Sequence, residues 1–261
     1  MSVAAPARRA PSWMAVTSLA QRIGSVALLL VVWQVVADAI HSRLLPSASA
    51  VFMAMIQESV HGPLLFNLGV TLARVVAAFT VAMVIGTAIG IVMGRSRTID
   101  ALFDSWLVLL LNLPALVIIV LAYVWFGLTE AAAIGAVAVN KIPNTAVTVR
   151  EGARALDRSY SDMAASFHVG RWRTLRHVIM PQLYPYIFAA GRSGLALVWK
   201  IVLIVELLGR SNGVGFEIQL YFQQFDVTRI LAYSIAFMVV IQIIEWAVFQ
   251  PLERRASAWR R

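Results

Sequence analysis

Long apolar runs, separated by short polar segments, dominate the chain. Six of these runs are close to the roughly 20 residues that a helix needs to cross the hydrocarbon core of a bilayer. Helices and closed barrels are the two structures that can span lipid, and the runs do not alternate apolar and polar residues as barrel strands do. The pattern therefore predicts an all-α membrane protein with six transmembrane helices, at residues 23–40, 71–93, 106–126, 131–149, 187–208 and 230–250.

Polar residues between and within the runs refine this layout. The stretch 44–49 predicts a turn at the membrane surface, and a short helix at 50–60 follows it. Asn112 and Pro114 interrupt the third run. The fourth run, which is weaker because it also holds Lys141, is interrupted by Asn140, Pro143, Asn144 and Thr145. Because proline removes a helical hydrogen bond, we expect kinks at both places, with unwound backbone lining a cavity as the alternative.

The composition supports lipid as the solvent for most of the chain. Of the 261 residues, 60% are hydrophobic and 13% are charged, whereas a soluble domain carries roughly 25% charged residues. There are no cysteines, which excludes disulfides, a thiol nucleophile and cysteine-ligated metals. A net charge of +9 would suggest nucleic acid on a soluble protein. Here the position of the charges matters more than their sum, and we expect no nucleic-acid partner.

Arginine is distributed unevenly between the two sides of the predicted membrane. If residues 1–22 are cytoplasmic, the outside loops hold Arg43, Arg210 and Arg229. The cytoplasmic segments then hold fifteen arginines: Arg8, Arg9, Arg22, Arg95, Arg97, Arg150, Arg154, Arg158, Arg171, Arg173, Arg176, Arg254, Arg255, Arg260 and Arg261. Because cytoplasmic loops carry the excess of Lys and Arg, both termini are expected in the cytoplasm. The predicted parts are a tail (1–22), a transmembrane domain (23–250) with a cytoplasmic loop at 150–186, and a second tail (251–261).

A cleavable signal peptide is the alternative to the first transmembrane helix, because Ala37-Asp38-Ala39 resembles a cleavage site. The apolar core of a signal peptide is typically ~7–15 residues long. The run that ends at this site is longer, so we favour an uncleaved first helix.

Residues 161–181 form a largely polar, basic stretch on the predicted cytoplasmic side. Their pattern predicts two short helices joined by a turn at 169–170. Ser161 or Asp162 can cap the first helix, because their side-chain oxygens accept from free backbone N–H groups. This helix has an apolar face made of Met163, Ala164 and Phe167. The second helix has an apolar stripe made of Trp172, Leu175, Val178 and Ile179.

Pro181 is expected to stop the second helix. Its basic residues, Arg171, Arg173 and Arg176, lie off the apolar stripe. Two short helices with an apolar tip and basic flanks suit a groove on another protein. The alternative is a surface helix that lies on anionic lipid headgroups.

This stretch resembles the EAA loop of ABC importer permeases, in which Glu-Ala-Ala precedes three residues, glycine, nine residues, isoleucine, one residue and Leu-Pro. Residues 162–164 stand where Glu-Ala-Ala would be, His168 stands in the glycine position, and residues 178–181 close the pattern. The glycine marks the turn between the helices, so Gly170 is the residue we expect to supply it. The resemblance implies that the loop docks on a cytoplasmic ATPase through Asp162, Met163, Ala164, Phe167, His168, Gly170 and Pro181.

Three further stretches, 113–130, 143–152 and 195–218, look like those of permeases for nitrate, taurine and aliphatic sulfonates. The resemblance covers about residues 64–248. It implies a permease subunit in the bacterial cytoplasmic (inner) membrane that imports a small anion of this type, driven by ATP. The implied partners are two cytoplasmic ABC ATPases, a second permease copy, most simply a homodimer, and a periplasmic or lipid-anchored substrate-binding protein.

The chain lacks the sequence features of an ATPase and of an intramembrane serine protease. A P-loop needs Gly-Lys-Ser/Thr, and the two lysines follow asparagine and tryptophan. ATP and Mg²⁺ are therefore expected on the partner ATPase, and no cofactor or metal site is expected here. The stretch 191–194 is similar to a rhomboid-type protease motif, but all four histidines precede Ser193 and lie outside the runs, so no base is expected for it. An ion-coupled secondary transporter that works without an ATPase is the remaining alternative.

Two lysines inside the apolar runs are candidates for a translocation pathway, because charged groups within a membrane are costly and often functional. Lys200 either attracts an anionic solute or pairs with a carboxylate such as Glu245. Lys141, with Asn144 close by in the sequence, either joins the pathway or extends its ammonium group to the membrane surface.

Three other charged residues lie in or near the runs. Glu206, near the outer end of the fifth run, is either a gate residue of the pathway or a packing residue. Arg74 and Arg192 lie near the ends of their runs. We expect these two arginines to orient helices rather than to contact solute.

Overall fold

The computed structural model describes residues 12–249; the predicted C-terminal tail and the first part of the N-terminal tail lie outside the described residues. Within this range the chain forms helices and no strands, which confirms the predicted all-α class. The α-helices are α1 (Ser12–Ile40), α2 (Ala48–Val60), α3 (Leu64–Arg95), α4 (Arg97–Asn112), α5 (Ala115–Phe126), α6 (Glu130–Arg154), α7 (Arg158–Ser166), α8 (Arg171–Thr174), α9 (Met180–Gly209), α10 (Val214–Gln223) and α11 (Val227–Ile244). Two π-helical turns are η1 (Leu175–Ile179) and η2 (Glu245–Phe249).

Three described helical stretches are long and apolar enough to cross a membrane: Leu64–Arg95, Trp172–Gly209 and Val227–Ala247. They correspond to the second, fifth and sixth predicted spans. The bent pair α4–α5 is a fourth if it counts as one span. The apolar part of α1, Gly24–Ile40, is shorter than these stretches, and α6 is not among them. The prediction of six spans and of their orientation therefore stays a prediction, while the short helix predicted at 50–60 is present as α2.

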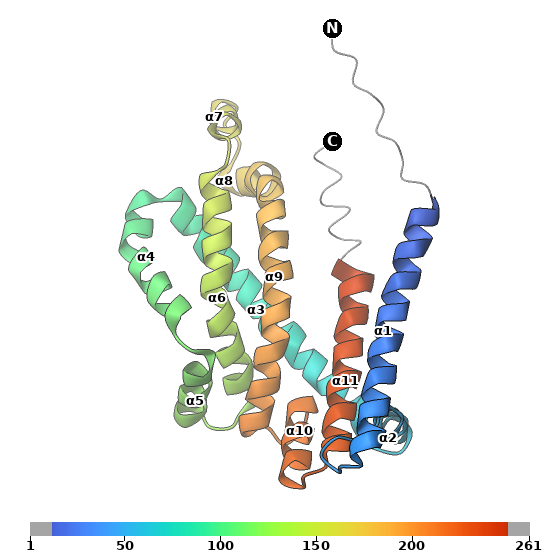
Figure 1. The fold of residues 1–261 in the computed structure, drawn as a ribbon. Coiled ribbons are helices and arrows are strands. Elements are labelled where there is room, and N and C mark those ends of the chain that lie inside the picture. Colours follow the sequence, from blue (N-terminus) through green and yellow to red (C-terminus); the bar gives the residue numbers. More distant parts are fainter. Residues whose placement is uncertain (1–11, 250–261) are drawn as a thin grey trace.

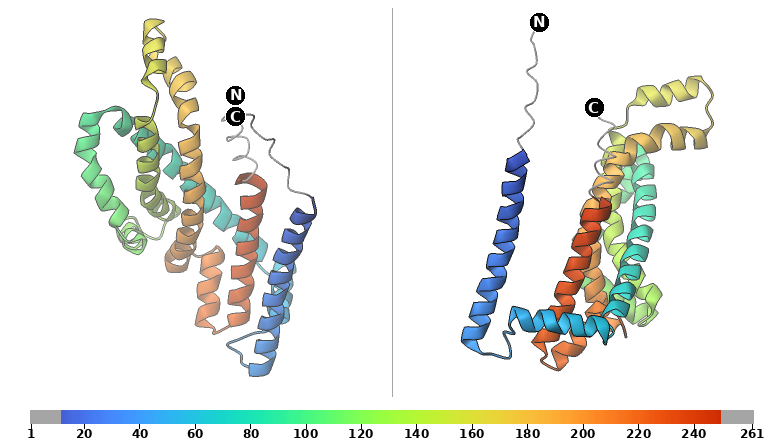
Figure 2. Two further views of the ribbon diagram at one scale, coloured as in Figure 1. Left: turned by 45° about the horizontal axis from the view of Figure 1, so that its top comes forward. Right: turned by 90° about the vertical axis from the view of Figure 1, so that its right-hand side faces the viewer.

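The centre of the bundle consists of α3, α6 and α9, and α6 packs against both of the others. Figure 1 shows the bent pair α4–α5 on one side of this centre and α2 and α11 on the other. In Figure 2 α1 stands apart from the bundle, and α7 and α8 project from one end of it. The short helix α10 lies at the opposite end of the bundle, against α9 and α11.

Three glycines, spaced by four residues on α3, allow its backbone to approach α6 closely. A Cβ atom added to Gly86 would lie 2.7 Å from Cβ of Thr145, and one added to Gly90 would lie 2.6 Å from the carbonyl oxygen of Ala146. Gly94 faces Ala153 in the same way. Small residues at this spacing are the usual means by which membrane helices pack without a hydrophobic driving force between them.

The two predicted helix interruptions have different outcomes. At Asn112 and Pro114 the chain bends by 96° between α4 and α5, so that prediction is confirmed. In the fourth run the alternative of unwound backbone is wrong, because α6 is helical throughout, including at the buried Pro143, and the kink there stays a prediction. Neighbouring helices can stabilise the backbone groups that proline frees within a membrane, and α6 has such neighbours in α3 and α9.

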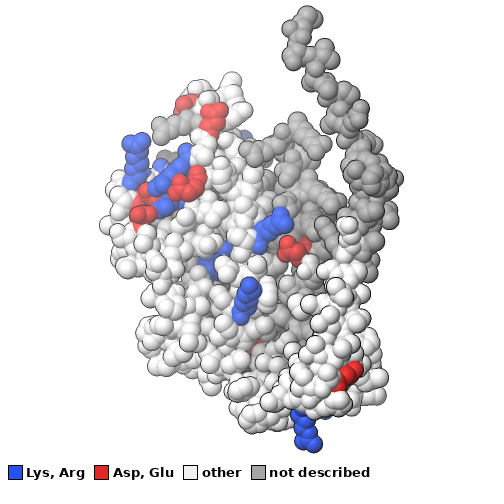
Figure 3. All heavy atoms as spheres, in the orientation of Figure 1, with Lys and Arg blue, Asp and Glu red and all other residues white. Residues whose placement is uncertain are grey.

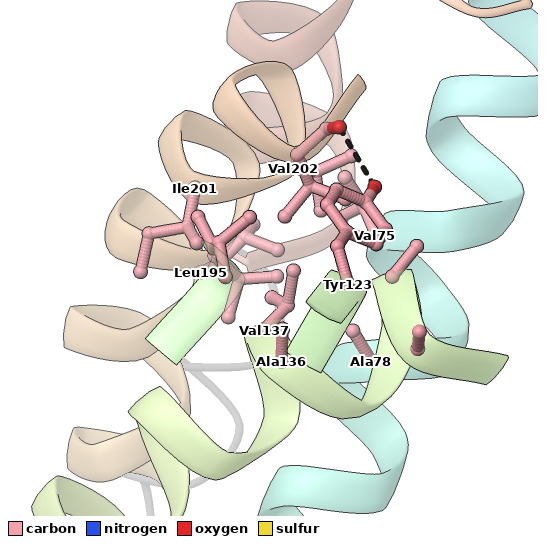
Figure 4. Close-up of a cluster of buried hydrophobic side chains, with 13 residues drawn as sticks. Val75, Ala78, Tyr123, Ala136, Val137, Leu195, Ile201 and Val202 are labelled. Atoms are coloured by element: carbon pink, nitrogen blue, oxygen red, sulfur yellow. Dashed lines mark hydrogen bonds between the residues drawn. The ribbon is translucent and has the colours of Figure 1, made fainter. Parts of the chain in front are cut away.

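The bend returns α5 to the bundle, where the largest apolar core forms (Figure 4). This core joins α3, α5, α6 and α9 through residues such as Val75, Val137 and Val202. The hydroxyl of Tyr123 donates to the carbonyl oxygen of Val205 at 2.8 Å. The polar atom of this side chain therefore has a hydrogen-bond partner in otherwise apolar surroundings. The core thereby fixes α9, the helix that connects the two ends of the molecule.

Candidate functional site

The projection from the end of the bundle begins one turn earlier than the sequence predicted. The N-terminal cap of α7 is Asp157, not Ser161 or Asp162, and its Oδ1 accepts from the backbone N–H of Ser159 at 2.9 Å and from its hydroxyl at 2.6 Å. Hydrogen bonds from Ser159 lower the pKa of the Asp157 carboxyl. The carboxylate therefore remains ionised and keeps capping the free N–H groups of the helix.

His168, not Gly170, forms the turn after α7. Its φ is 52°, in the left-handed region, whereas Gly170 is absent from the described residues with positive φ. The N–H of Val169 donates to the carbonyl of Ala164 and the N–H of His168 to that of Ala165, both at 2.9 Å. This pair of bonds is the Schellman arrangement, which places a left-handed residue just beyond the helix. His168 thus adopts a left-handed conformation, which glycine adopts most readily.

The second helix of the projection does not stop at Pro181, contrary to the prediction. From Trp172 to Gly209 the chain is one helical stretch of 38 residues, in which the π turn η1 ends two residues before Pro181. A proline ring clashes with the carbonyl four residues earlier. The wider π turn moves that carbonyl away from the ring, so the helix continues. The projection is therefore joined to α9 without a flexible break.

Apolar side chains are exposed at the tip of this projection, which Figure 2 shows in side view. The exposed fractions are 77% for Phe167, 71% for Trp172 and 53% for Met163. Ala164, on the same predicted face, is buried instead. At the base, Ile179 of the predicted second stripe packs with Leu183 and Ala153. We refer to Met163, Phe167 and Trp172 as the apolar tip.

Ion pairs join α4 to α6 below the apolar tip. Arg150 donates to Asp104 and, at 3.3 Å, to Asp100. Arg154 donates to Asp100 and, at 3.0 Å, to Glu151. These side chains are partly exposed, so each pair contributes little by itself, but together they hold the base of the projection.

At the opposite end of the bundle, Arg74 is the centre of a buried polar network. Its guanidinium donates to Glu206 at 2.7 Å, to Glu130 at 2.6 Å and to the carbonyl oxygen of Asn212 at 2.8 Å. Arg74 is 4% exposed and Glu206 is 1% exposed. The hydrogen bond from Arg74 lowers the pKa of the Glu130 carboxyl, which lies at the start of α6. The network therefore joins α3, α6, α9 and the α9–α10 loop.

The α9–α10 loop is held to α3 and α9 by its backbone. The N–H of Gly215 donates to Glu206 at 2.9 Å, and that of Gly213 donates to Oδ1 of Asn67 at 2.7 Å. Gly213 has a φ of 107°, and a Cβ there would collide with the Glu206 carboxylate. Nδ2 of Asn67 donates in turn to Glu217 at 2.8 Å, whose pKa is raised by burial.

This network was missing from the sequence predictions, although part of its signal was visible. Arg74, Glu130 and Glu206 all lie at the predicted outer ends of different apolar runs. Opposite charges at one membrane depth are candidates for pairing. The structure shows Arg74 orienting helices, as predicted, and shows how: it bridges carboxylates on two other helices.

The two lysines occupy different environments. Lys141 is 1% exposed and donates to Oδ1 of Asn144 at 2.8 Å, so it does not extend to the membrane surface as one prediction had it. Lys200 is exposed on α9 and lies 5.4 Å from the ring centre of Trp199. Glu245, its predicted partner, instead lies 3.8 Å from Arg192. The structure therefore brings Lys141 together with Asn144, and in the described residues it shows no ion pair between Lys200 and Glu245.

Comparison with known proteins gives the family. Residues 83–253 match the model of the family described as binding-protein-dependent transport system inner membrane component. The taurine transport system permease protein TauC of Escherichia coli (strain K12) is 28% identical over 91% of this chain and 88% of its own length. A putative aliphatic sulfonates transport permease protein, SsuC of Bacillus subtilis (strain 168), is 26% identical over 90% and 85%.

The fold gives an independent comparison. A crystal structure of an amino acid ABC transporter with histidines superposes with a TM-score of 0.59, over 78% of this chain and 98% of the other, at 22% identity. The fold is therefore shared with a chain of that transporter. The family match spans well over half of the sequence. This chain thus belongs to the family of binding-protein-dependent transport system inner membrane components.

Proposed function

We propose that this chain imports a small anion, of the taurine and sulfonate type, across the bacterial inner membrane, using ATP hydrolysed by separate subunits. The family match supports the role of a permease in such a system. The printed names of the relatives, for taurine and aliphatic sulfonates, support the substrate class. The observation that carries the proposal is the apolar tip, exposed on a rigid projection at one end of the bundle.

The apolar tip is proposed to dock in a groove of a cytoplasmic ATPase. Large apolar side chains that are exposed together mark an interaction site, and the turn at His168 holds them in a fixed arrangement. The basic flanks and the ion-paired base keep this end in water. Together with its helical neighbours Asp162 and Ala164, the tip matches the EAA loop of the family, so the resemblance and the geometry indicate the same contact.

The helix that begins beside the tip is proposed to transmit ATPase motion. The stretch Trp172–Gly209 has no break, and at its far end Glu206 belongs to the Arg74 network. A displacement of the tip therefore acts on the far end of the bundle through one continuous helical element. In this scheme Glu206 is part of the outer gate, and opening of the gate requires the network to rearrange.

One face of α6 and α9 is proposed to line the solute pathway, completed by a second permease copy. Asn140, Asn144 and Thr148 are spaced by four residues, so they share a face of α6, and all three are half-buried. Lys141 donates to Asn144 from beneath this face, and Lys200 is exposed on α9. Figure 3 shows Lys and Arg side chains (blue) surrounded mainly by uncharged residues on the surface over α6 and α9. Positive charge at this depth favours an anionic solute.

Co-purification tests the proposal. The tagged full chain, expressed with its genetic neighbours and extracted in several mild detergents, is expected to carry an ABC ATPase at near one-to-one stoichiometry. A substrate-binding protein encoded beside it would then deliver the solute from outside the membrane. A chain that purifies without an ATPase in every detergent, yet transports, would overturn the proposal in favour of an ion-coupled secondary transporter.

Uptake measurements test the pathway. In vesicles that contain the full complex, Lys200→Met is expected to reduce ATP-driven taurine uptake, while Lys200→Arg, which keeps the charge, retains it. Equal uptake by both variants would remove Lys200 from the pathway without affecting the assignment as a permease.

A further inference from the structure

An apolar cavity of about 440 Å³ lies between α3 and α4. Its walls are formed only by apolar side chains, including Ala88, Val92 and Met93 of α3 and Phe103 and Leu107 of α4. In the described residues no side chain of the protein fills it. A second apolar cavity, of about 460 Å³, shares Leu110 with the first and continues along α5 and α6. Together they form an apolar trough along the inner side of the bent pair.

Two arginines without a carboxylate partner lie at the end of this trough, where α3 passes into α4. Arg95 and Arg97 are exposed, and among the described residues no ion pair involves either of them. The neighbouring arginines differ, because Arg150 and Arg154 are matched by Asp100, Asp104 and Glu151. Within the ion-paired base formed by α4 and α6 the charges are matched, whereas Arg95 and Arg97 at the adjoining α3–α4 turn add positive charge without a partner among the described residues.

A polar cavity of about 670 Å³ joins these arginines to the apolar trough. It is lined by Arg95 and Arg97 and by the ion pair of Arg154 with Asp100. It shares Met93 with the apolar cavity. Asp157 and Asp162 line it as well, from the α6–α7 loop and α7. An anion in this cavity is therefore attracted to the α3–α4 turn and repelled from α7.

We propose that the adjoining cavities hold one anionic phospholipid, with an acyl chain in the apolar trough and the phosphate headgroup at Arg95 and Arg97. In a membrane the apolar cavity is surrounded by hydrocarbon, and an acyl chain is the apolar group present at the highest concentration. Basic residues near the headgroup level select anionic over zwitterionic lipids. This site is independent of the function proposed above.

The lipid contributes to the packing of α4. It fills the space between α3 and α4, and α4 carries Asp100 and Asp104, which hold Arg150 and Arg154 at the base of the projection. Loss of the lipid therefore loosens the contact between α4 and α6 that supports the apolar tip.

Native mass spectrometry of the purified full chain in detergent tests this site. The chain is titrated with phosphatidylglycerol and, separately, with phosphatidylcholine of the same acyl chains. We expect one saturable phosphatidylglycerol per chain and weaker binding of phosphatidylcholine. Each arginine near the headgroup contributes roughly a fivefold change in affinity, so Arg95→Gln with Arg97→Gln should weaken binding of phosphatidylglycerol by roughly 25-fold. Arg43→Gln, at an exposed arginine in the α1–α2 loop, is the matched control and should bind as the unmodified chain does.

A second pair of variants tests the apolar part. Ala88→Trp fills the trough without altering charge and should also weaken phosphatidylglycerol binding, whereas Leu111→Trp, at an exposed position of α4 outside the cavity lining, should not. Circular dichroism and gel filtration confirm that each variant is folded.

Three results would overturn the proposal. The first is equal, unsaturable binding of both lipids. The second is full competition by inorganic phosphate with no effect of Ala88→Trp, which would indicate a phosphate site without an acyl chain. The third is loss of a dimer, rather than of lipid, in Ala88→Trp, which would make a second copy of the chain the occupant of the trough.

Discussion

The two ends of the long helical stretch that contains α9 differ in which side chains are exposed and which are buried. At the end with α7 and α8, large apolar side chains are exposed and the charged groups are partly in water. At the end with α10, charged groups are buried and their hydrogen bonds are satisfied by side chains and backbone. The first end is the one proposed to dock on another protein. The second is constructed to hold four segments of the chain together until something separates them.

The difference shows where conformational change is expected. A buried hydrogen-bond network with several partners is stable in one arrangement, and it is strongly unfavourable when only half of its bonds are made. We therefore expect the network to change between two distinct arrangements rather than to deform gradually. The apolar tip gains from contact with a partner and loses nothing within the chain. Between them, Trp172–Gly209 is one continuous helical path, about 57 Å along its axis at 1.5 Å per residue, which bends where the projection joins α9 (Figure 2). We therefore expect the end with α10 to contribute most to stability and the projection to contribute to the proposed coupling.

The largest effect is expected from Arg74→Met at the outer end. This substitution leaves Glu206 buried without its cation, and removal of one partner from a buried pair typically costs about 3–5 kcal/mol. The free energy of unfolding, measured by titration with denaturing detergent in mixed micelles, should fall by this amount. In Arg74→Met with Glu206→Leu no charge is left unpaired there, so much of the loss should be recovered. A single variant as stable as the unmodified chain would show that the network is not structural.

A smaller loss is expected from Gly90→Leu at the α3–α6 contact. A side chain there overlaps the backbone of Ala146 and the side chain of Val149, and overpacking typically costs about 1–3 kcal/mol. Gly69→Leu is the matched control, because Gly69 lies on the same helix and a Cβ there meets nothing within 4 Å. The same unfolding measurement should separate the two variants. Equal stability of both would mean that α3 and α6 do not pack as closely as described.

At the projection the expected effect on stability is small and the effect on assembly is large. Phe167→Asp changes an exposed residue, so the free energy of unfolding should change by less than about 0.5 kcal/mol. Co-purification of the ATPase should be lost, because a charge is placed in the docking contact. Phe222→Asp, at an exposed phenylalanine on α10, should retain the ATPase. Retention in both variants would contradict docking through the tip.

The contrast between the ends also separates what the sequence could predict from what it could not. The apolar runs, the break at Asn112 and Pro114 and the existence of a projection follow from local patterns, because each depends on residues close together in the chain. The Arg74 network joins residues more than fifty positions apart, and a single sequence carries only weak signals for such contacts. The continuation of the helix through Pro181 depends on the π turn before it, which has no simple residue signature.

The turn at His168 is a different case. The expectation that glycine forms such a turn is sound, but it led to the wrong residue, Gly170. A turn between two helices favours glycine, and Gly170 was the nearest one. The hydrogen bonds of Val169 and His168 to α7 fix the left-handed position at 168 instead. The position of the turn relative to the end of α7 therefore mattered more than the preference of the turn for glycine. As a result, the backbone of His168 is strained.

That strain gives the smallest of the expected effects, and it tests the geometry of the projection most directly. A left-handed conformation costs a residue with a Cβ about 1–2 kcal/mol, and glycine in turn loses roughly 0.5–1 kcal/mol through the entropy of the unfolded chain. His168→Gly should therefore stabilise the turn by up to about 1 kcal/mol, measured as slower amide hydrogen exchange in α7. Gly170→Ala is the matched control: its Cβ meets nothing within 4 Å and the residue is not left-handed, so exchange should not become faster. If Gly170→Ala speeds exchange and His168→Gly leaves it unchanged, the turn lies at Gly170, and the arrangement of the apolar tip must be different.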